Sequence, residues 1–255
     1  MISKRNIFVF ILPVWILSGC GNTINRHLSY PSDTKWVTVE IKNPSPFTKP
    51  FPLEVRYISK KCLKRRISGF DGSVISEPSY NVVRIPLQKM KNSNVWQGRV
   101  AITGGGSCKW TLSAINLGVE YVDVSHIGKD LQPGTAVGAT VAFDNDASRN
   151  GQFETIRGGI ISLSSEYFPM IKTDKMIRQV DSVSLFGKNN FMKKRVVGNI
   201  GNMKIQFNPK LDESKLVRMI APKTNNRGDF YKIIYPDGTM TSDGSTHPDV
   251  KRLIK

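Results

Sequence analysis

The chain has 255 residues, of which 39% are hydrophobic and 22% are charged. This length is enough to bury a hydrophobic core, either in one large β domain or in two small domains. The net charge of +17 indicates acidic partners, although solubility alone is an equally open explanation of so basic a chain.

The N-terminus has the features of a secretory signal peptide. Lys4 and Arg5 form a short basic tip, and an apolar run follows from Ile7 to Leu17. Residues 6–19 number fourteen, whereas a membrane-spanning helix needs about 20 apolar residues, which argues against an uncleaved anchor helix. We therefore predict a signal peptide at residues 1–19.

The stretch Leu17-Ser18-Gly19-Cys20 resembles the lipobox of bacterial lipoproteins. The resemblance implies that Cys20 becomes the first residue of the mature protein and carries lipid on its sulfur and its amine, so that the chain is anchored to a membrane on its periplasmic face. In such families an Asp directly after the cysteine retains the protein in the inner membrane. Gly21 and Asn22 stand there in this chain, so the resemblance favours the outer membrane.

Export from the cytosol decides which acidic partners the charge can serve. The leader contains two of the 37 basic residues and none of the 20 acidic ones, so the mature chain has a net charge of +15. Nucleic acid is the usual partner of such a charge in the cytosol, and export excludes it. Anionic phospholipid, peptidoglycan and an acidic protein remain.

Alternating apolar and polar residues predict a mainly β chain. Residues 20–35 are polar and form a predicted tether for the lipid. A proline-rich loop is expected at 43–52, and the glycine-rich residues 103–107 predict a hairpin turn. We predict strands at residues 36–42, 53–57, 83–87, 96–102, 108–114, 119–124, 136–143 and 160–163.

Two cysteines remain once Cys20 is assigned to the lipid. In an oxidising periplasm, Cys62 and Cys108 most simply form one disulfide, with a sequence separation of 46 residues. The alternative, a reactive thiol, needs a neighbouring base that the sequence does not identify. Trp110 is in register with Cys108, which is consistent with an aromatic side chain packed against the disulfide.

Basic residues gather in two clusters, which we predict to be surfaces for an anionic partner. The first surrounds Cys62, and the second follows Phe191 and Met192. Arginine offers bidentate contacts to phosphate or carboxylate, and such clusters also suit an anionic membrane surface. Two solvated loops are the alternative interpretation. The clusters consist of Lys60, Lys61, Lys64, Arg65 and Arg66, and of Lys193, Lys194 and Arg195.

Residues 144–153 resemble the first half of a calcium loop. Oxygen-bearing side chains at Asp144, Asp146, Ser148 and Asn150 precede Gly151, which allows a sharp turn. The twelfth position is Arg157, where such a loop needs a bidentate Glu, so any affinity for calcium would be weak. A polar hairpin loop without metal is the other interpretation. No other cofactor is predicted.

The composition becomes more basic after residue 169. We place a boundary there and predict strands at 180–185, 203–207, 216–220, 231–235 and 239–241, followed by a short terminal helix that begins near Pro248. The predicted fold is an antiparallel β-sandwich-like body at 36–169 with a smaller basic β-rich domain or extension at 170–255.

No catalytic residues are predicted. The three histidines, His27, His126 and His247, lie far apart in the sequence, and no nucleophile motif singles out a serine. A hydrolase with an unrecognised site stays the third hypothesis, after the two binding functions described next.

The lipobox, together with the segments 95–100 (VWQGRV) and 106–110 (GSCKW), is similar to periplasmic immunity lipoproteins associated with type VI secretion effectors. That resemblance implies a non-enzymatic protein that covers the active site of a toxin such as a lipase, with basic clusters that speed the capture of an acidic partner. The alternative is an envelope structural or assembly lipoprotein that contacts peptidoglycan or a secretion machine.

Overall fold

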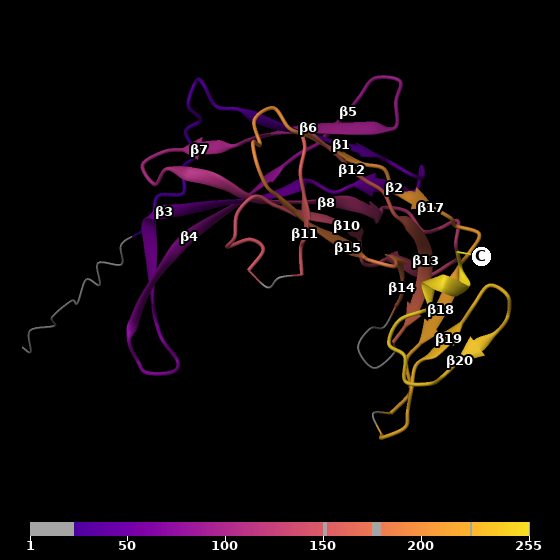
Figure 1. Ribbon diagram of the computed structural model, residues 1–255. Helices are drawn as coiled ribbons and strands as arrows, with labels where there is room; N and C mark the ends of the chain where they lie inside the picture. The colour runs from indigo at the N-terminus through magenta and orange to yellow at the C-terminus, as the bar shows by residue number, and fades with distance from the viewer. Residues whose placement is uncertain (1–22, 150–151, 175–179, 225, 255) are drawn as a thin grey trace, which may run out of the picture.

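The computed structural model describes residues 23–149, 152–174, 180–224 and 226–254. The predicted signal peptide and Cys20 lie outside the described residues, so both stay predictions. The fold is mainly β, as the alternating sequence pattern predicts, and its strands form three mixed sheets in the described ranges (Figure 1). We call them sheets 1, 2 and 3.

Sheet 1 has its strands in the order β12-β16-β1-β6-β5. Its central strand β1 shows why the sequence pattern is a strand: Val37, Val39 and Ile41 are fully buried, and the residues between them are partly exposed. The strands are β1 (Trp36–Lys42), β5 (Gln88–Lys89), β6 (Val95–Ala101), β12 (Ile160–Leu163) and β16 (Lys204–Phe207).

Sheet 2 has the order β11-β15-β10-β8-β3-β4, and β2 and β7 also pair with β8. Both faces of β8 are largely buried, because other elements cover the sheet on each side there. The strands are β2 (Thr48–Pro50), β3 (Leu53–Ile67), β4 (Val74–Ile85), β7 (Thr103–Gly105), β8 (Trp110–Tyr121), β10 (Val137–Ala142), β11 (Glu154–Ile156) and β15 (Phe191–Val196).

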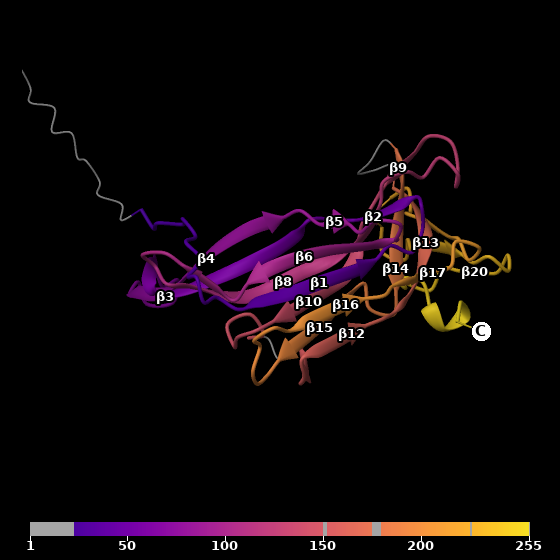
Figure 2. The same ribbon diagram turned by 90° about the horizontal axis from the view of Figure 1, so that it is seen from above.

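Sheet 3 has the order β20-β19-β18-β13-β14-β9, with β17 paired to β13. It lies at the end of the molecule that carries the C-terminus, opposite the β3–β4 hairpin (Figures 1 and 2). The strands are β9 (Leu131–Pro133), β13 (Glu166–Thr173), β14 (Asp181–Gly187), β17 (Lys210–Leu211), β18 (Val217–Ile220), β19 (Lys232–Ile234) and β20 (Met240–Thr241).

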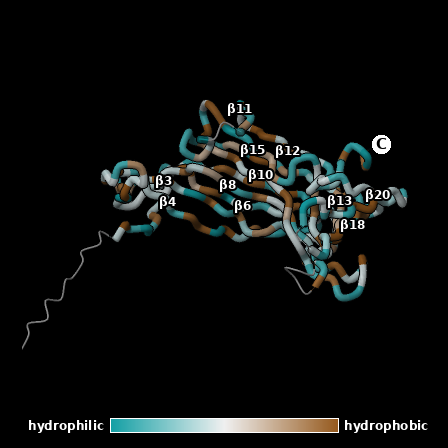
Figure 3. The backbone as a smooth tube through the Cα atoms, turned by 90° about the horizontal axis from the view of Figure 1, so that it is seen from below, coloured by the Kyte–Doolittle hydropathy of each residue, from teal (hydrophilic) through white to brown (hydrophobic). Residues whose placement is uncertain are grey.

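Two hydrophobic clusters hold these sheets together. The larger draws side chains from all three sheets, such as Val39 of β1, Ile115 of β8 and Leu185 of β14. The smaller belongs to sheet 3 and includes Phe168, Phe186 and Leu253. Figure 3 shows hydrophobic and hydrophilic residues interspersed along β6, β8 and β10.

The antiparallel arrangement predicted for the body is wrong, because the sheets are mixed. β1 pairs with β16 in parallel and with β6 in antiparallel, and β15 is parallel to β10. A tight hairpin forces its two strands to be antiparallel, whereas strands joined by long connections are free to be parallel. The chain makes such connections when it leaves β12 for the β13–β14 hairpin and then returns to β15 and β16.

The predicted terminal helix is also wrong, since the structure has only a 3-10 turn at Val250–Arg252. Asp249 caps this turn by accepting a hydrogen bond from the Lys251 backbone, and Leu253 is buried in the smaller cluster. So short a segment gains few helical hydrogen bonds, so side-chain contacts decide its shape. The Arg252 guanidinium lies 3.8 Å from the ring centroid of Tyr235.

Other predicted elements differ in extent. The proline-rich loop at 43–52 contains the short strand β2, and the two strands expected at 108–114 and 119–124 are the single strand β8. The pattern did not predict β13 or β15. The expected boundary at residue 169 falls inside β13, and β15 and β16 pair with strands of the preceding part of the chain.

Candidate binding surfaces

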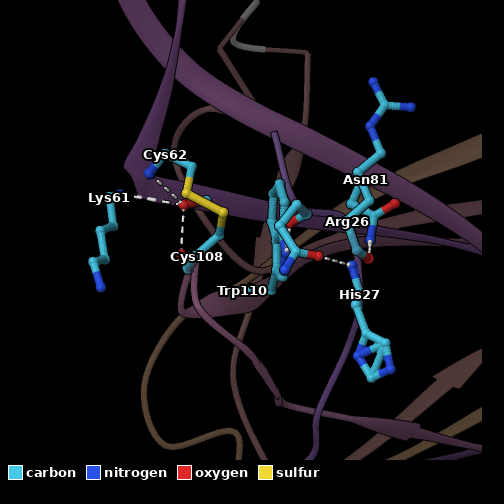
Figure 4. Close-up of a disulfide and its surroundings, with 9 residues drawn as sticks. Arg26, His27, Lys61, Cys62, Asn81, Cys108 and Trp110 are labelled. Atoms are coloured by element: carbon cyan, nitrogen blue, oxygen red, sulfur yellow. Dashed lines mark hydrogen bonds between the residues drawn. A yellow bond between two sulfur atoms is a disulfide. The ribbon is translucent and has the colours of Figure 1, made fainter. Parts of the chain in front are cut away.

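The described start of the chain lies against the body next to the disulfide (Figure 4). The buried Trp110 indole donates a hydrogen bond to the carbonyl oxygen of Asn25 at 3.1 Å, and the Asn81 amide donates to that of Arg26 at 2.7 Å. Ser29 then forms a parallel bridge with Gly105. The segment that follows the predicted lipid site is therefore fixed beside β4 and β7.

The disulfide between Cys62 and Cys108 is confirmed, with a Cα–Cα distance of 5.3 Å. It lies where the pairing of β3 with β4 shifts register between Ser59 and Leu63. The buried Ser59 hydroxyl donates to the Cys108 carbonyl and accepts from the backbone N–H groups of Lys61 and Cys62. This irregularity is a bulge whose polar groups are satisfied, and the disulfide ties it to the turn before β8.

Beyond the disulfide, β3 and β4 continue as a hairpin that we call the basic hairpin (residues 60–77). The pairing of β3 with β8 ends at Ile58, so the basic hairpin extends beyond the rest of sheet 2 (Figure 1). Its turn is closed by a hydrogen bond from Ser68 N–H to the Ser73 carbonyl, with Gly72 at a φ of 71°. The first basic cluster is therefore part of a paired strand and not a solvated loop.

The two faces of the basic hairpin differ in chemistry. Successive residues of a strand point to opposite faces, so Leu63, Arg65 and Ile67 share one face with Val74 of β4. All three of these aliphatic side chains are exposed, and Phe70 in the turn is fully exposed. We call Leu63, Ile67, Phe70 and Val74 the apolar set.

The opposite face of the hairpin carries its ion pairs. Glu77 pairs with Arg66 at 2.6 Å and with Lys64 at 3.5 Å. Its carboxyl loses some solvation there, but the hydrogen bond from Arg66 is the largest effect and holds the pKa of Glu77 below its usual range. Lys60, Lys61 and Arg65 have no ion pair with any residue that the structure describes.

The second basic cluster lies on β15, which β10 and β8 separate from β3 in sheet 2. The structure therefore does not bring the two predicted clusters into one patch. Lys194 pairs with Glu154, Lys193 donates to the side chain of Gln152, and Arg195 donates to that of Asn145. These contacts hold the second basic cluster against β11 and the loop that precedes β11.

Lys193 and Lys194 line a groove of about 1190 Å³ between β15, sheet 3 and the C-terminal turn. Its apolar wall includes Met170, Phe191 and Ile254, of which the last two are exposed. Its charged residues are Lys172, Lys188, Lys193, Lys194, Lys251, Glu154 and Asp249. We call this the basic groove.

The acidic residues do not neutralise the basic groove. Glu154 is paired with Lys194, and Asp249 caps the terminal turn. Lys188 and Lys251 are exposed and have no side-chain ion pair among the described residues. Aromatic and methionine side chains beside unneutralised lysines suit the contact of an acidic protein surface.

The calcium-like residues serve the turn itself where the structure describes them. The Asp144 carboxylate accepts a hydrogen bond from the Ala147 N–H at 2.6 Å, and the Ser148 hydroxyl donates to the Asp144 carbonyl. Asp146 pairs with Arg149 at 2.7 Å. Asn150 lies outside the described residues. These contacts are those of a polar turn, and the calcium site stays a prediction.

A separate polar cluster joins sheet 3 to the other end of β8. Glu213, between β17 and β18, accepts a hydrogen bond from the Tyr121 hydroxyl at 2.9 Å and contacts His126 Nε2 at 3.0 Å. The Ser45 hydroxyl donates to its other oxygen, and His126 stacks on Phe47. Burial, with the neighbouring Glu213 carboxylate, raises the pKa of Tyr121. We call these residues the Glu213 cluster.

Within the described ranges, no three His, Cys, Asp or Glu side chains lie close enough to hold a metal ion together. None of the described helices is long and apolar enough to cross a membrane. Comparisons with protein-family models, curated proteins and solved structures found no match.

Sequence reasoning identified five basic residues of the hairpin but missed its apolar set. The available signal was the alternation of Leu63, Arg65 and Ile67 beyond Cys62, followed by the turn residues at 68–73. The basic groove had no such signal, because Lys172, Lys188 and Lys251 come from three separate segments. Only the tertiary structure gathers them around the same wall.

Proposed function

We propose that this protein is a lipid-anchored periplasmic binding protein of the immunity type, which covers the active site of a secreted toxin such as a type VI lipase effector. In this proposal β15, sheet 3 and the C-terminal turn carry the binding surface, and Cys20 carries the lipid. The observation that carries the binding function is the basic groove, where lysines with no acidic partner among the described residues surround an apolar wall.

The charge and the wall have separate roles in this proposal. The lysines steer an acidic partner toward the groove and raise the association rate, which falls as salt screens the charges. The apolar wall then gives the complex its lifetime, because a few large apolar side chains that become buried in a complex can supply most of its affinity. The partner is therefore a protein with an acidic surface and a protruding apolar residue.

The position of the groove supports the same function. It is bordered by sheet 3 and the C-terminal turn, whereas the chain's described start lies at the end with the basic hairpin (Figures 1 and 2). A lipid near that start leaves the groove directed away from the anchor. A toxin bound there is held by the anchored protein on the side that faces away from the membrane that it attacks.

The test is a pull-down with the lipidated protein from cells that contain the native secretion and toxin genes, followed by mass spectrometry of the bound proteins. We expect one stoichiometric partner whose toxic activity is inhibited in the complex. The double variant Lys188→Glu/Lys251→Glu should bind this partner about tenfold more weakly, because it places acidic groups on the groove.

The matched control is Lys89→Glu/Lys91→Glu, which makes the same change in net charge at and beside β5. This variant should bind as tightly as the unchanged protein. Equal losses in the two double variants would show that net charge and not the groove controls binding. Recovery of only peptidoglycan fragments or of many abundant acidic proteins would instead favour the envelope structural or assembly function.

A further inference from the structure

The basic hairpin combines features that the groove does not share. Its residues 60–77 have a net charge of +3, and the whole apolar set is exposed around them. Soluble proteins seldom expose apolar residues in one contiguous patch without a partner for that patch. Here the patch follows one face and the turn of a two-stranded extension, while the ion pairs of Glu77 lie on the other face.

The end of the molecule that bears the hairpin also bears the start of the described chain. Asn81 of β4 holds Arg26, and Asn81 is only four residues from Glu77 at the base of the hairpin. Cys20 precedes Thr23 by three residues, and each residue spans at most about 3.6 Å. A lipid on Cys20 therefore enters the bilayer within about 11 Å of Thr23.

We propose that the turn and the apolar face of the basic hairpin lie on the anionic surface of the bilayer that holds the lipid of Cys20. The proposal rests on the lipid anchor of the proposed function. Phe70 and the neighbouring aliphatic side chains enter the boundary between headgroups and acyl chains, while Lys60, Lys61 and Arg65 contact phosphates. The stems of these basic side chains can lie along the apolar surface with their charges in the headgroup layer.

The lipid on the sulfur and the amine of Cys20 attaches the chain to the bilayer, and a basic patch beside it adds an attraction to anionic headgroups. Each basic residue near an anionic surface adds roughly fivefold to the affinity. The disulfide fixes the base of the hairpin to the body, so contact of the hairpin with the bilayer also fixes the orientation of the body. Under this proposal the basic groove faces away from the bilayer.

The test uses the lipidated protein with Phe70→Trp, reconstituted on vesicles that contain anionic phospholipid and a brominated lipid that quenches tryptophan fluorescence on contact. Quenching is measured relative to the unchanged protein, which corrects for the native tryptophans. We expect the added tryptophan to be quenched. Phe230→Trp, a half-exposed position before β19 of sheet 3, should show no added quenching.

A charge-reversal pair separates the hairpin from general electrostatics. Adding Lys60→Glu/Arg65→Glu to the Phe70→Trp protein should abolish the quenching, whereas Lys89→Glu/Lys91→Glu should leave it unchanged. Salt at about 1 M, where the Debye length is about 3 Å, should reduce it. Vesicles without anionic lipid should also give less quenching.

The outcomes separate this proposal from the one on which it rests. If the protein does not float with the vesicles, the lipid anchor is contradicted and the hairpin contact with it. If it floats with the vesicles but position 70 is not quenched, only the hairpin contact is contradicted. Equal quenching at positions 70 and 230 would also overturn it, because the molecule would then have no fixed orientation.

Discussion

At the residue scale, Glu40 shows how a charged side chain stabilises the outer face of sheet 1. Its carboxylate pairs with Lys204 of β16 at 2.8 Å and accepts hydrogen bonds from Gln97 of β6 and Gln206 of β16. The side chain links three neighbouring strands, because Glu40 is directly opposite both Gln97 and Gln206. Such cross-strand polar contacts each contribute a few tenths to about 1 kcal/mol.

The pKa of Glu40 gives this cluster a predicted pH dependence. Partial burial raises the pKa, but hydrogen bonds and attraction from Lys204, with the two glutamines, outweigh it and hold the pKa below its ordinary value of 4.5. The unfolded chain therefore binds a proton more readily than the folded protein. The contribution of Glu40 to stability is fully present above pH 4.5 and is lost as the pH falls through the lower folded-state pKa.

We predict that Glu40→Gln lowers the free energy of unfolding by about 1 kcal/mol at neutral pH. The difference from the unchanged protein should shrink in acid, since both then carry a neutral group at this position. Urea unfolding at pH 7 and at about pH 3 measures it. Glu166→Gln, at an exposed residue of β13, should have little effect at either pH, and an equal loss at both pH values for Glu40→Gln would contradict the prediction.

At the element scale, the disulfide decides whether the basic hairpin has a fixed base. Among the described strands, β3 leaves its pairing with β8 at Ile58 and continues beyond it with β4 alone. Two-stranded hairpins are marginally stable by themselves in water. The Ser59 hydroxyl holds the base of the hairpin through one buried hydrogen bond to the Cys108 carbonyl. The Cys62–Cys108 disulfide holds the same base covalently.

We predict that Cys62→Ala/Cys108→Ala lowers the free energy of unfolding by about 4 kcal/mol, because a 46-residue separation constrains the unfolded chain strongly. Denaturant unfolding measures the loss, and amide hydrogen exchange should rise most in the hairpin beyond Ser59. A reducing agent should destabilise the unchanged protein and leave the double variant unaffected. If both proteins responded alike to reduction, the effect would come from elsewhere.

At the scale of the whole molecule, the Glu213 cluster controls how sheet 3 is attached to the rest. Glu213 belongs to the connection between two strands of sheet 3, while Tyr121 ends β8 of sheet 2 and Ser45 precedes β2. The larger hydrophobic cluster also crosses this junction, through Tyr167 and Leu185 of sheet 3. Hydrophobic packing therefore attaches sheet 3 to the rest of the molecule, and the polar contacts of the Glu213 cluster fix its orientation.

We predict that Glu213→Ala lowers the free energy of unfolding by about 1–3 kcal/mol, since Tyr121 and Ser45 lose a charged acceptor in a partly buried site. Hydrogen exchange should rise in β17 and β18 more than in β1, because the contact is local to the junction. Ser214→Ala is the control, because among the described residues the exposed Ser214 hydroxyl donates to Asp212 of the same loop alone. Similar exchange changes in the two variants would contradict the prediction.

The sequence by itself determined where several of the strands lie and which of their residues are buried. The alternation of Val37, Val39 and Ile41 predicts β1, and residues 160–163 coincide with β12, because a strand has a local period of two residues. The disulfide also followed from the sequence, since only Cys62 and Cys108 remain after Cys20 is assigned to the lipid. The basic residues at 60–66 were recognised from their density along the chain.

Only the tertiary structure decided which strands are neighbours and which surfaces result. The parallel partner of β1 is β16, more than 160 residues later, and no local pattern specifies such a pairing. The apolar face of the hairpin depends on the register that places Ile67 beside Val74, and the groove depends on lysines from separate strands and the terminal turn. A local pattern fixes the faces of one strand, whereas partners and surfaces depend on the burial that all the strands achieve together.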